Sequence, residues 1–334
     1  MRDNKSVTIQ IVRVLAMTMI LIDHTIVNLN VPLKSFISQV TNSGVIVFIF
    51  LSAYLFGGKQ ITNYKQWYIK RIKRIMIPFW IFMIIDFILE AVIWDSFDWE
   101  LIPVHAFGLQ GIEGLGVVVG SIHLWYITLI LILYLLTPAI QWISKKLGKK
   151  KILVLIPLAI VQVVTSYTID WGLFSRPLSW CILALEVYLI GYWLGEIKIL
   201  DKIGTREFWG STIVMLASIV LVFAWRKFIG ENTAYERIVQ PYALVAVDWW
   251  ICVVVSLVRE WKLPDLVMRV VGLLDSISYE VYIVHGLVIA MGAMPVLNNY
   301  GTVAYMATVI IGTMVAAVVL HLLSEAVYKM MKKS

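Results

Sequence analysis

The stretch Arg13–His24, "RVLAMTMILIDH", indicates the fold class, because its residues are apolar between two ionisable ends. Similar apolar runs recur along the chain, and many approach the roughly 20 residues that cross the hydrocarbon core of a bilayer. Lipid offers the backbone no hydrogen-bond partners, so each run must bond its own peptide groups, as a helix does. This stretch and the other apolar runs therefore predict an all-α, polytopic transmembrane helical bundle.

The composition supports a membrane protein rather than a soluble one. The chain has 334 residues, of which 60% are hydrophobic and 15% charged, whereas soluble domains rarely exceed half apolar residues. Its net charge of +7 comes from basic residues in short connections between the runs, which argues against nucleic acid as a partner. The two cysteines, Cys181 and Cys252, lie inside apolar runs and predict neither a disulfide framework nor a metal site.

About ten spans are predicted from the lengths of the apolar runs. They lie at about 9–30, 36–57, 75–93, 123–143, 152–169, 179–195, 210–228, 240–258, 270–291 and 303–323. Alternate connections hold 22 Lys and Arg residues on one side and 5 on the other, which predicts that both termini are cytoplasmic. The longest connection, about 94–122, would face outward. We expect 1–334 to form a single integral-membrane domain with no soluble domain appended.

Arg13 and His24 are eleven residues apart in the first predicted span. On a helix this spacing places them on one face, roughly 16 Å apart along the axis. Ionisable groups within spans are costly and usually line a cavity or a path. The alternative is that Arg13 reaches to the headgroups and His24 is merely interfacial. Asp23 projects about 100° away from His24, so it is not the natural orienting partner of that ring.

Two further histidines, His123 and His285, are expected at the same depth as His24. Each one alone is more simply a structural residue. Together they favour a shared polar cavity in the outer half of the bundle. The predicted spans also contain acids that should pair with buried Arg or His, and the sequence leaves the pairs open; these acids are Asp86, Glu90, Glu186, Asp248, Asp275 and Glu280.

Arg71 and Arg74 precede the third predicted span in "YIKRIKRIMIPFW". Their spacing of three places them on one helix face at the membrane edge. Arginine forks suit phosphate groups, so a phosphorylated cytoplasmic ligand is one interpretation. The other is that both residues are ordinary positive-inside anchors.

These elements, in this order, resemble the acyltransferase-3 family of integral-membrane acyltransferases of bacterial envelopes, over essentially the whole chain. The matching elements are Arg13 and His24 with ten residues between them, "GVIVFIFLSAYLF", "RIKRIMIPFW", "HLWYI" with His123, Trp125 and Tyr126, and "ISYEVYIVH" with Ser278, Tyr279, Tyr282 and His285. The chain departs from the family at Ala53, where a glycine is usual, and at Asp23, where the family often has Gly.

The resemblance implies transfer of an acyl group, commonly acetyl, from cytoplasmic acyl-CoA such as acetyl-CoA to a hydroxyl of an envelope or exported glycan. The enzyme would be multi-pass in the cell membrane, with acyl-CoA as a cosubstrate and no permanently bound cofactor or metal.

The implied roles follow from the chemistry of each side chain. His24 would be the general base, and Arg13 would steer the donor along its path. Arg71 and Arg74 would bind the donor phosphates. The candidates for acceptor binding or oxyanion stabilisation are Asp23, His123, Trp125, Tyr279, Tyr282 and His285. An acyl-histidine intermediate is an open alternative to direct transfer.

A second function class remains open, because buried ionisable residues also serve proton relays. A secondary transporter or flippase would use them without covalent chemistry, although the sequence shows no inverted repeat. Turnover of acyl-CoA by the purified protein discriminates between the two classes. The expected partners are acyl-CoA, a glycan or glycolipid acceptor and the lipid bilayer, and the sequence also leaves room for a homo-oligomer.

Overall fold

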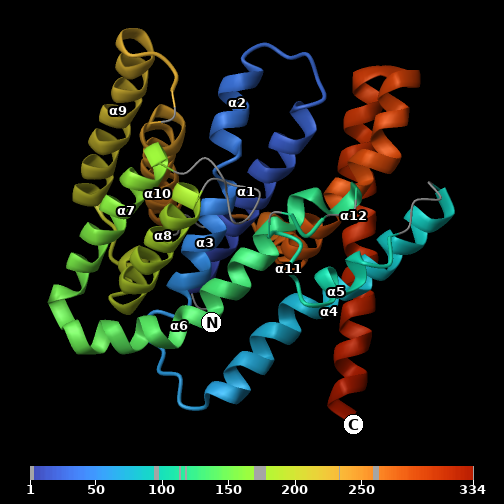
Figure 1. The fold of residues 1–334 in the computed structure, drawn as a ribbon, viewed down its shortest axis with the longest axis horizontal. Helices are drawn as coiled ribbons and strands as arrows, with labels where there is room; N and C mark the ends of the chain where they lie inside the picture. The colour runs from blue at the N-terminus through green and yellow to red at the C-terminus, as the bar shows by residue number, and fades with distance from the viewer. Residues whose placement is uncertain are drawn as a thin grey trace. The chain divides into compact units, whose positions relative to one another are not determined.

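The computed structural model describes residues 4–93, 98–112, 114–116, 119–168, 178–232, 234–258 and 263–333. The predicted all-α class is confirmed, because these residues form helices joined by short connections and contain no strand (Figure 1). The α-helices are α1 (Asn4–Ile26), α2 (Lys34–Thr41), α3 (Gly44–Tyr54), α4 (Tyr64–Ile93), α5 (Leu101–Ala106), α6 (Trp125–Leu147), α7 (Leu155–Thr168), α8 (Leu178–Glu196), α9 (Thr205–Phe228), α10 (Gln240–Val258), α11 (Asp265–Leu287) and α12 (Met294–Lys333).

Shorter helical segments join several of these helices. They are η1 (Val119–Leu124), η2 (Gly148–Val154), η3 (Ile199–Asp201), η4 (Tyr235–Val239) and η5 (Val288–Ala293). The predicted outward connection is described only in part, since residues 94–97, 113 and 117–118 lie outside the described residues.

Within the described residues, eight helical stretches are long and apolar enough to cross a membrane. They are Val7–Ile26, Lys34–Tyr54, Tyr64–Ile93, Ser121–Thr168, Leu178–Glu196, Thr205–Phe228, Tyr235–Val258 and Asp265–Lys332. Two of them, with 48 and 68 residues, each contain two of the spans predicted from the sequence.

Both long stretches are interrupted where the sequence predicts a connection. In the first, the 3₁₀ segment η2 (Gly148–Val154) separates α6 from α7. In the second, Gly301 has φ 82° and ψ −176°, which breaks α12 into two helices. A side chain with a Cβ rarely adopts this backbone conformation, so a glycine suits the break.

The basic segment before the third predicted span is helical and continues into that span without a break. Helix α4 begins at Tyr64 and carries Arg71 and Arg74 on its early turns. Since the backbone there is helical, a spacing of three does place these residues on one face.

The chain divides into two compact units, and each is built from three separate stretches. Unit 1 contains Met1–Met19, Gln39–Thr62 and Leu136–Asp275, and unit 2 contains Ile20–Ser38, Asn63–Leu135 and Ser276–Ser334.

In unit 1, α3 and α8 approach so closely that glycines are required at their contact. A Cβ on Gly191 would lie 2.6 Å from the Phe50 carbonyl oxygen, and one on Gly195 only 2.2 Å from that of Tyr54. The two glycines form a G-x-x-x-G spacing, the small-residue pattern that lets membrane helices pack backbone to backbone.

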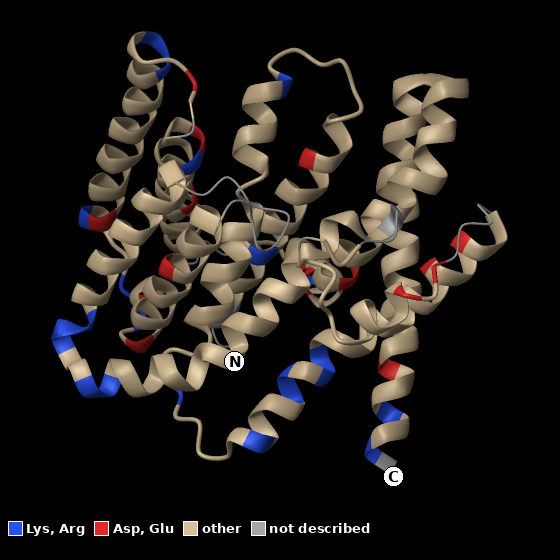
Figure 2. Ribbon diagram, viewed as in Figure 1, with Lys and Arg blue, Asp and Glu red and all other residues tan. Residues whose placement is uncertain are grey.

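In unit 2, α12 runs alongside α4 and also secures the end of α1. The Tyr305 hydroxyl donates to the Thr25 carbonyl at 3.0 Å and accepts from the Asn28 amide at 3.1 Å. Leu29, Ile289 and Tyr305 belong to one buried apolar cluster. Figure 2 shows basic residues along the early turns of α4 and at the last turns of α12.

Candidate functional site

Three histidine rings from distant parts of the sequence meet inside unit 2. His24 comes from α1, His123 from η1 and His285 from α11. The ring centroids are 4.2 Å apart for His123 and His285, 5.0 Å for His24 and His285, and 6.0 Å for His24 and His123. His123 and His285 are buried, whereas His24 is only half-buried. The structure thus brings the three predicted histidines together, with His24 as the most accessible ring.

The His123 ring is held by α11 in a defined tautomer. Its Nε2 lies 2.9 Å from the Tyr282 carbonyl oxygen and 3.0 Å from that of Ile283. Carbonyl oxygens only accept, so Nε2 must carry the proton. In return, the Tyr282 hydroxyl donates to the His123 carbonyl at 2.6 Å. This reciprocal pair fixes η1 against α11.

The His285 ring has the opposite tautomer. Its Nδ1 lies 3.2 Å from the Val281 carbonyl oxygen, one turn earlier on α11, so the proton sits on Nδ1. Its Nε2 therefore carries no proton and has a lone pair that can accept a hydrogen bond. That atom is buried and has no hydrogen-bond partner among the residues that the structure describes.

The two tyrosines predicted as oxyanion donors use their hydroxyl hydrogens in bonds to backbone. Tyr282 donates to the carbonyl of His123, and Tyr279 donates to that of Ile75 on α4 at 2.9 Å. A phenol has one hydrogen to give, so each tyrosine would have to leave its present acceptor to bind an oxyanion. Trp125 lies buried at the start of α6, directly after the segment that carries His123.

Asp23 accepts a hydrogen bond from the Ser38 hydroxyl, which ties the end of α1 to α2. This acid is one of the two positions, with Ala53, where the chain departs from the family pattern. The expectation that Asp23 does not orient His24 stays a prediction.

Arg71 and Arg74 occupy the early turns of α4, also in unit 2. The guanidinium carbon of Arg71 lies 5.9 Å from the Trp67 ring centroid, within reach of a cation–π contact. Arg74 is exposed. On α12, the Tyr328 hydroxyl lies 3.1 Å from the Lys73 carbonyl oxygen and 3.3 Å from that of Arg74, so α12 supports this turn.

Arg13 lies in unit 1, where its Nη1 is 2.7 Å from the Asp275 carboxylate oxygen. Both side chains are mostly buried, with 23% and 13% exposed. Asp275 was one of several acids that the sequence left unassigned, and α11 supplies it as the partner of Arg13.

The other predicted buried acids divide between the units. In unit 2, Glu280 accepts from the His321 ring at 3.0 Å, a pair that the sequence did not indicate. Asp86 is fully buried with both carboxylate oxygens unpartnered among the described residues, and Glu90 lies one turn along α4. In unit 1, Tyr242 donates to Glu186 and Ser43 donates to Asp248.

His105, in α5, is buried outside the histidine cluster. Its Nδ1 donates to the Leu101 carbonyl at 2.9 Å, and its Nε2 lies 3.3 Å from the Ser121 hydroxyl. Burial lowers the pKa of His105, because the apolar surroundings disfavour the charged ring. Both ring nitrogens are occupied, which accords with a structural role.

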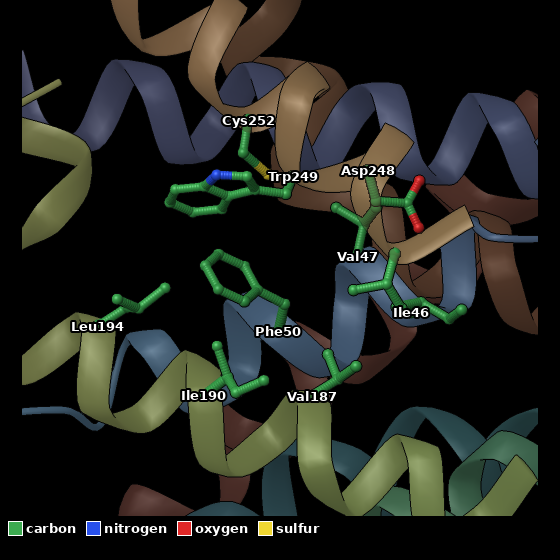
Figure 3. A pocket seen from close by; sticks show the side chains of 10 residues that line it. Ile46, Val47, Phe50, Val187, Ile190, Leu194, Asp248, Trp249 and Cys252 are labelled. Atoms are coloured by element: carbon green, nitrogen blue, oxygen red, sulfur yellow. The ribbon is translucent and has the colours of Figure 1, made fainter. Parts of the chain in front are cut away.

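Unit 1 contains an apolar cavity of about 270 Å³ between α3, α8 and α10. It is lined by Ile46, Val47, Phe50, Val187, Ile190, Leu194, Val245, Asp248, Trp249 and Cys252. Figure 3 shows the rings of Phe50 and Trp249 along the cavity, while the Asp248 carboxylate projects away from them. The cavity is thus a hydrocarbon-lined space, whereas the histidine cluster belongs to unit 2.

No group of three or more His, Cys, Asp and Glu residues within the described ranges is arranged to hold a metal ion. In the histidine cluster, Nε2 of His123 and Nδ1 of His285 are turned to carbonyl oxygens instead.

Comparison with known proteins identifies the family. A family model described as an acyltransferase domain matches residues 7–322 of the 334-residue chain. The comparisons with curated proteins and with solved structures find no match. The match includes most of both units and every candidate site residue. Together with the apolar helices, it describes a multi-pass membrane protein. The chain belongs to the acyltransferase-3 family of membrane acyltransferases.

Proposed function

We propose that the protein transfers an acetyl group from cytoplasmic acetyl-CoA to a hydroxyl of an envelope or exported glycan, in the cell membrane. The observation that carries this proposal is the meeting of His24, His123 and His285 in one unit of a family acyltransferase. A neutral imidazole titrates near neutral pH, so it suits the removal of a proton from a hydroxyl.

His24 is the general base in this proposal. It is the least buried of the three rings and therefore the one most accessible to an acceptor. His24 takes the proton of the acceptor hydroxyl as its oxygen attacks the thioester carbonyl. The new C–O bond forms, the C–S bond breaks, and the CoA thiolate leaves and takes up the proton from His24, which restores the neutral base. Direct transfer needs no acyl-histidine, which remains the alternative route.

The donor path proposed from the sequence is compatible with the contacts inside unit 2. Arg71 and Arg74 would hold the nucleotide phosphates. The residue after Arg74, Ile75, accepts a hydrogen bond from Tyr279 of α11. His285 follows six residues later on the same helix, roughly 9 Å along the axis. An extended pantetheine arm is long enough to cover this distance from phosphates at α4 to a thioester at the histidines.

The test is turnover of acetyl-CoA by the purified protein in lipid nanodiscs, with a glycan fraction from the envelope as acceptor. We expect His24→Ala to lower the rate about 10²- to 10⁴-fold, the usual contribution of a general base. His24→Gln should fail equally, because an amide cannot take a proton at neutral pH.

His105→Gln is the matched control, since it alters another histidine of unit 2 outside the cluster. Near-normal turnover by His24→Ala would exclude the general-base role. Absence of turnover by the wild-type protein, together with transport of a labelled glycolipid, would favour the flippase class instead.

A further inference from the structure

The apolar cavity of unit 1 is a space for which the acyl-transfer proposal provides no use. Its volume is about 270 Å³, and its lining residues belong to α3, α8 and α10. In another protein, a cavity of about 150 Å³ with a similar apolar lining stays dry and binds benzene, which has six carbon atoms. By this comparison, the cavity of unit 1 has room for roughly ten carbon atoms.

The lining of the cavity is suited to hydrocarbon rather than to water. It is almost wholly apolar, and Asp248 is its one acidic side chain. The Asp248 carboxylate accepts a hydrogen bond from the Ser43 hydroxyl at 2.8 Å and projects away from the cavity (Figure 3). A buried water needs several polar partners, so the lining favours an apolar ligand.

The cavity is elongated along its helices. On α8 it is lined by Val187, Ile190 and Leu194, and on α10 by side chains between Val245 and Cys252. Each of these sets covers about two helical turns, or roughly 10 Å along the helix axis. Figure 3 shows the three α8 side chains in a row along one wall. This shape suits a stretch of linear alkyl chain better than a compact ring.

The cavity opens between two membrane-spanning helices. Its partly exposed lining residues all lie on α8 and α10; they are Ile190, Leu194, Val245 and Trp249. The lining residues of α3 form a buried floor, where Val47 is 2% exposed. All three helices belong to stretches that are long and apolar enough to cross a membrane. The opening therefore faces the hydrocarbon core of the bilayer.

We propose that the apolar cavity binds one hydrocarbon chain of a membrane phospholipid, which enters from the bilayer between α8 and α10. The headgroup stays at the interface, because no basic residue lies among the described residues of the lining to bind its phosphate. An unfilled cavity of this size would cost stability, whereas a bound chain restores the missing dispersion contacts. Chain binding does not depend on acyl transfer, because the cavity belongs to unit 1 and the histidine cluster to unit 2.

The test is photo-crosslinking in phosphatidylcholine nanodiscs, in which a fraction of the lipid has a diazirine near the end of one acyl chain. Surrounding lipid will label the outer helices in any case, so the floor of the cavity is the informative part. Val47 and Phe50 are 2% and 8% exposed, so a chain must enter the cavity to reach them. We expect mass spectrometry to find adducts on these two residues. Wild-type protein that is labelled elsewhere but not on the floor would overturn the proposal.

Filling the opening should prevent entry of the chain. Val245→Trp fills it from α10, so the floor adducts should be lost while adducts on α9 persist. Val220→Trp is the matched control, because Val220 is 66% exposed on α9 and lies outside the lining. If thermal unfolding shows that Val245→Trp does not fold, Ile190→Trp fills the opening from α8 instead. Floor adducts that persist in a folded, filled variant would contradict entry between these helices.

Competing ligands distinguish a phospholipid chain from other hydrocarbon chains. Acetyl-CoA should leave the floor adducts unchanged, because it has no long alkyl chain. Palmitoyl-CoA or a polyprenyl glycolipid, added at a low mole fraction of the lipid, should also leave them unchanged. Displacement of the adducts by either long-chain ligand would assign the cavity to a donor or an acceptor chain and would overturn the phospholipid assignment. Acetyl transfer, measured separately, tests the proposed function whatever occupies the cavity.

Discussion

At the scale of single residues, Arg13 illustrates how a predicted catalytic residue can also be a structural one. Its guanidinium forms an ion pair with Asp275 at 2.7 Å, and both side chains are largely withdrawn from solvent. Removing one member of such a pair leaves a largely buried charge without its ion-pair partner, which usually costs stability. The stability of the protein and the path of the donor therefore have to be measured separately for this residue.

The double variant Arg13→Ala with Asp275→Ala separates these two roles. We expect Arg13→Ala alone to destabilise the protein by about 2–4 kcal/mol, because Asp275 loses its ion-pair partner while it stays mostly buried. Adding Asp275→Ala should recover much of this loss, as thermal unfolding would show. Acetyl transfer should remain low in the double variant if Arg13 also steers the donor. Full recovery of both stability and turnover would assign Arg13 to structure alone.

At the scale of helices, the contact between α3 and α8 depends on residues that have no side chain. A Cβ on Gly195 would lie only 2.2 Å from the Tyr54 carbonyl oxygen. Real Cβ atoms do not approach oxygen so closely, so any substitution must separate the two backbones. Separation would also disturb the apolar cavity, which the same two helices line together with α10.

Gly195→Ala should therefore destabilise the protein by about 1–3 kcal/mol, the usual cost of overpacking. Gly210→Ala on α9 is the matched control, because a Cβ at Gly210 meets nothing within 4 Å. That control should be neutral or stabilising by up to about 1 kcal/mol, since alanine favours helix over glycine. Thermal unfolding in one detergent would measure both, and equal stability of the two variants would contradict the close packing.

At the scale of the whole molecule, the proposal separates donor binding from proton transfer. Arg71 and Arg74 lie on the early turns of α4. The three histidines of the cluster lie at the end of α1, in η1 and near the end of α11. A loss of binding and a loss of chemistry should then result from different substitutions.

Arg71→Ala and Arg74→Ala should each weaken acetyl-CoA binding about ten- to a hundredfold, the effect of one lost charge-assisted hydrogen bond. Lysine at either position should restore only part of the affinity, because it keeps the charge and loses the fork. His24→Ala should leave the affinity nearly unchanged. Calorimetry on purified variants would measure these constants.

Lys65→Ala is the control for charge, since Lys65 is an exposed cation earlier on the same helix. If Arg71→Ala and Arg74→Ala bound acetyl-CoA as tightly as Lys65→Ala and the wild type, both arginines would be ordinary membrane-edge anchors.

The sequence alone was sufficient to predict the helical class and most helix positions. Helix α10 spans the predicted residues 240–258, and α8 differs from its prediction by one residue at each end. Such accuracy has a physical basis, because a span satisfies its own backbone bonds and its apolar length is local information. The early start of α4 was missed, because its first turns are too polar to count as part of a span.

Side-chain pairings were decided only by the tertiary structure. Arg13 and Asp275 are 262 residues apart, and Glu280 and His321 are 41 apart. Which acid meets which base depends on how each helix is rotated and packed, and apolar length contains no information about rotation. The G-x-x-x-G spacing at Gly191 and Gly195 was visible in the sequence, but its partner α3 was not.

The histidine cluster was predictable only in part, unlike the helix positions, which were mostly predicted, and the side-chain pairings, which were not. The sequence determined which rings to consider, because ionisable groups are rare in apolar spans and three of them were expected at one depth. Only the packing of α1, η1 and α11 brought the three rings together. The tautomers of His123 and His285 were determined only by the carbonyls of Val281, Tyr282 and Ile283. A tautomer is set by the hydrogen bond at the other ring nitrogen, and that partner exists only once the helices have packed.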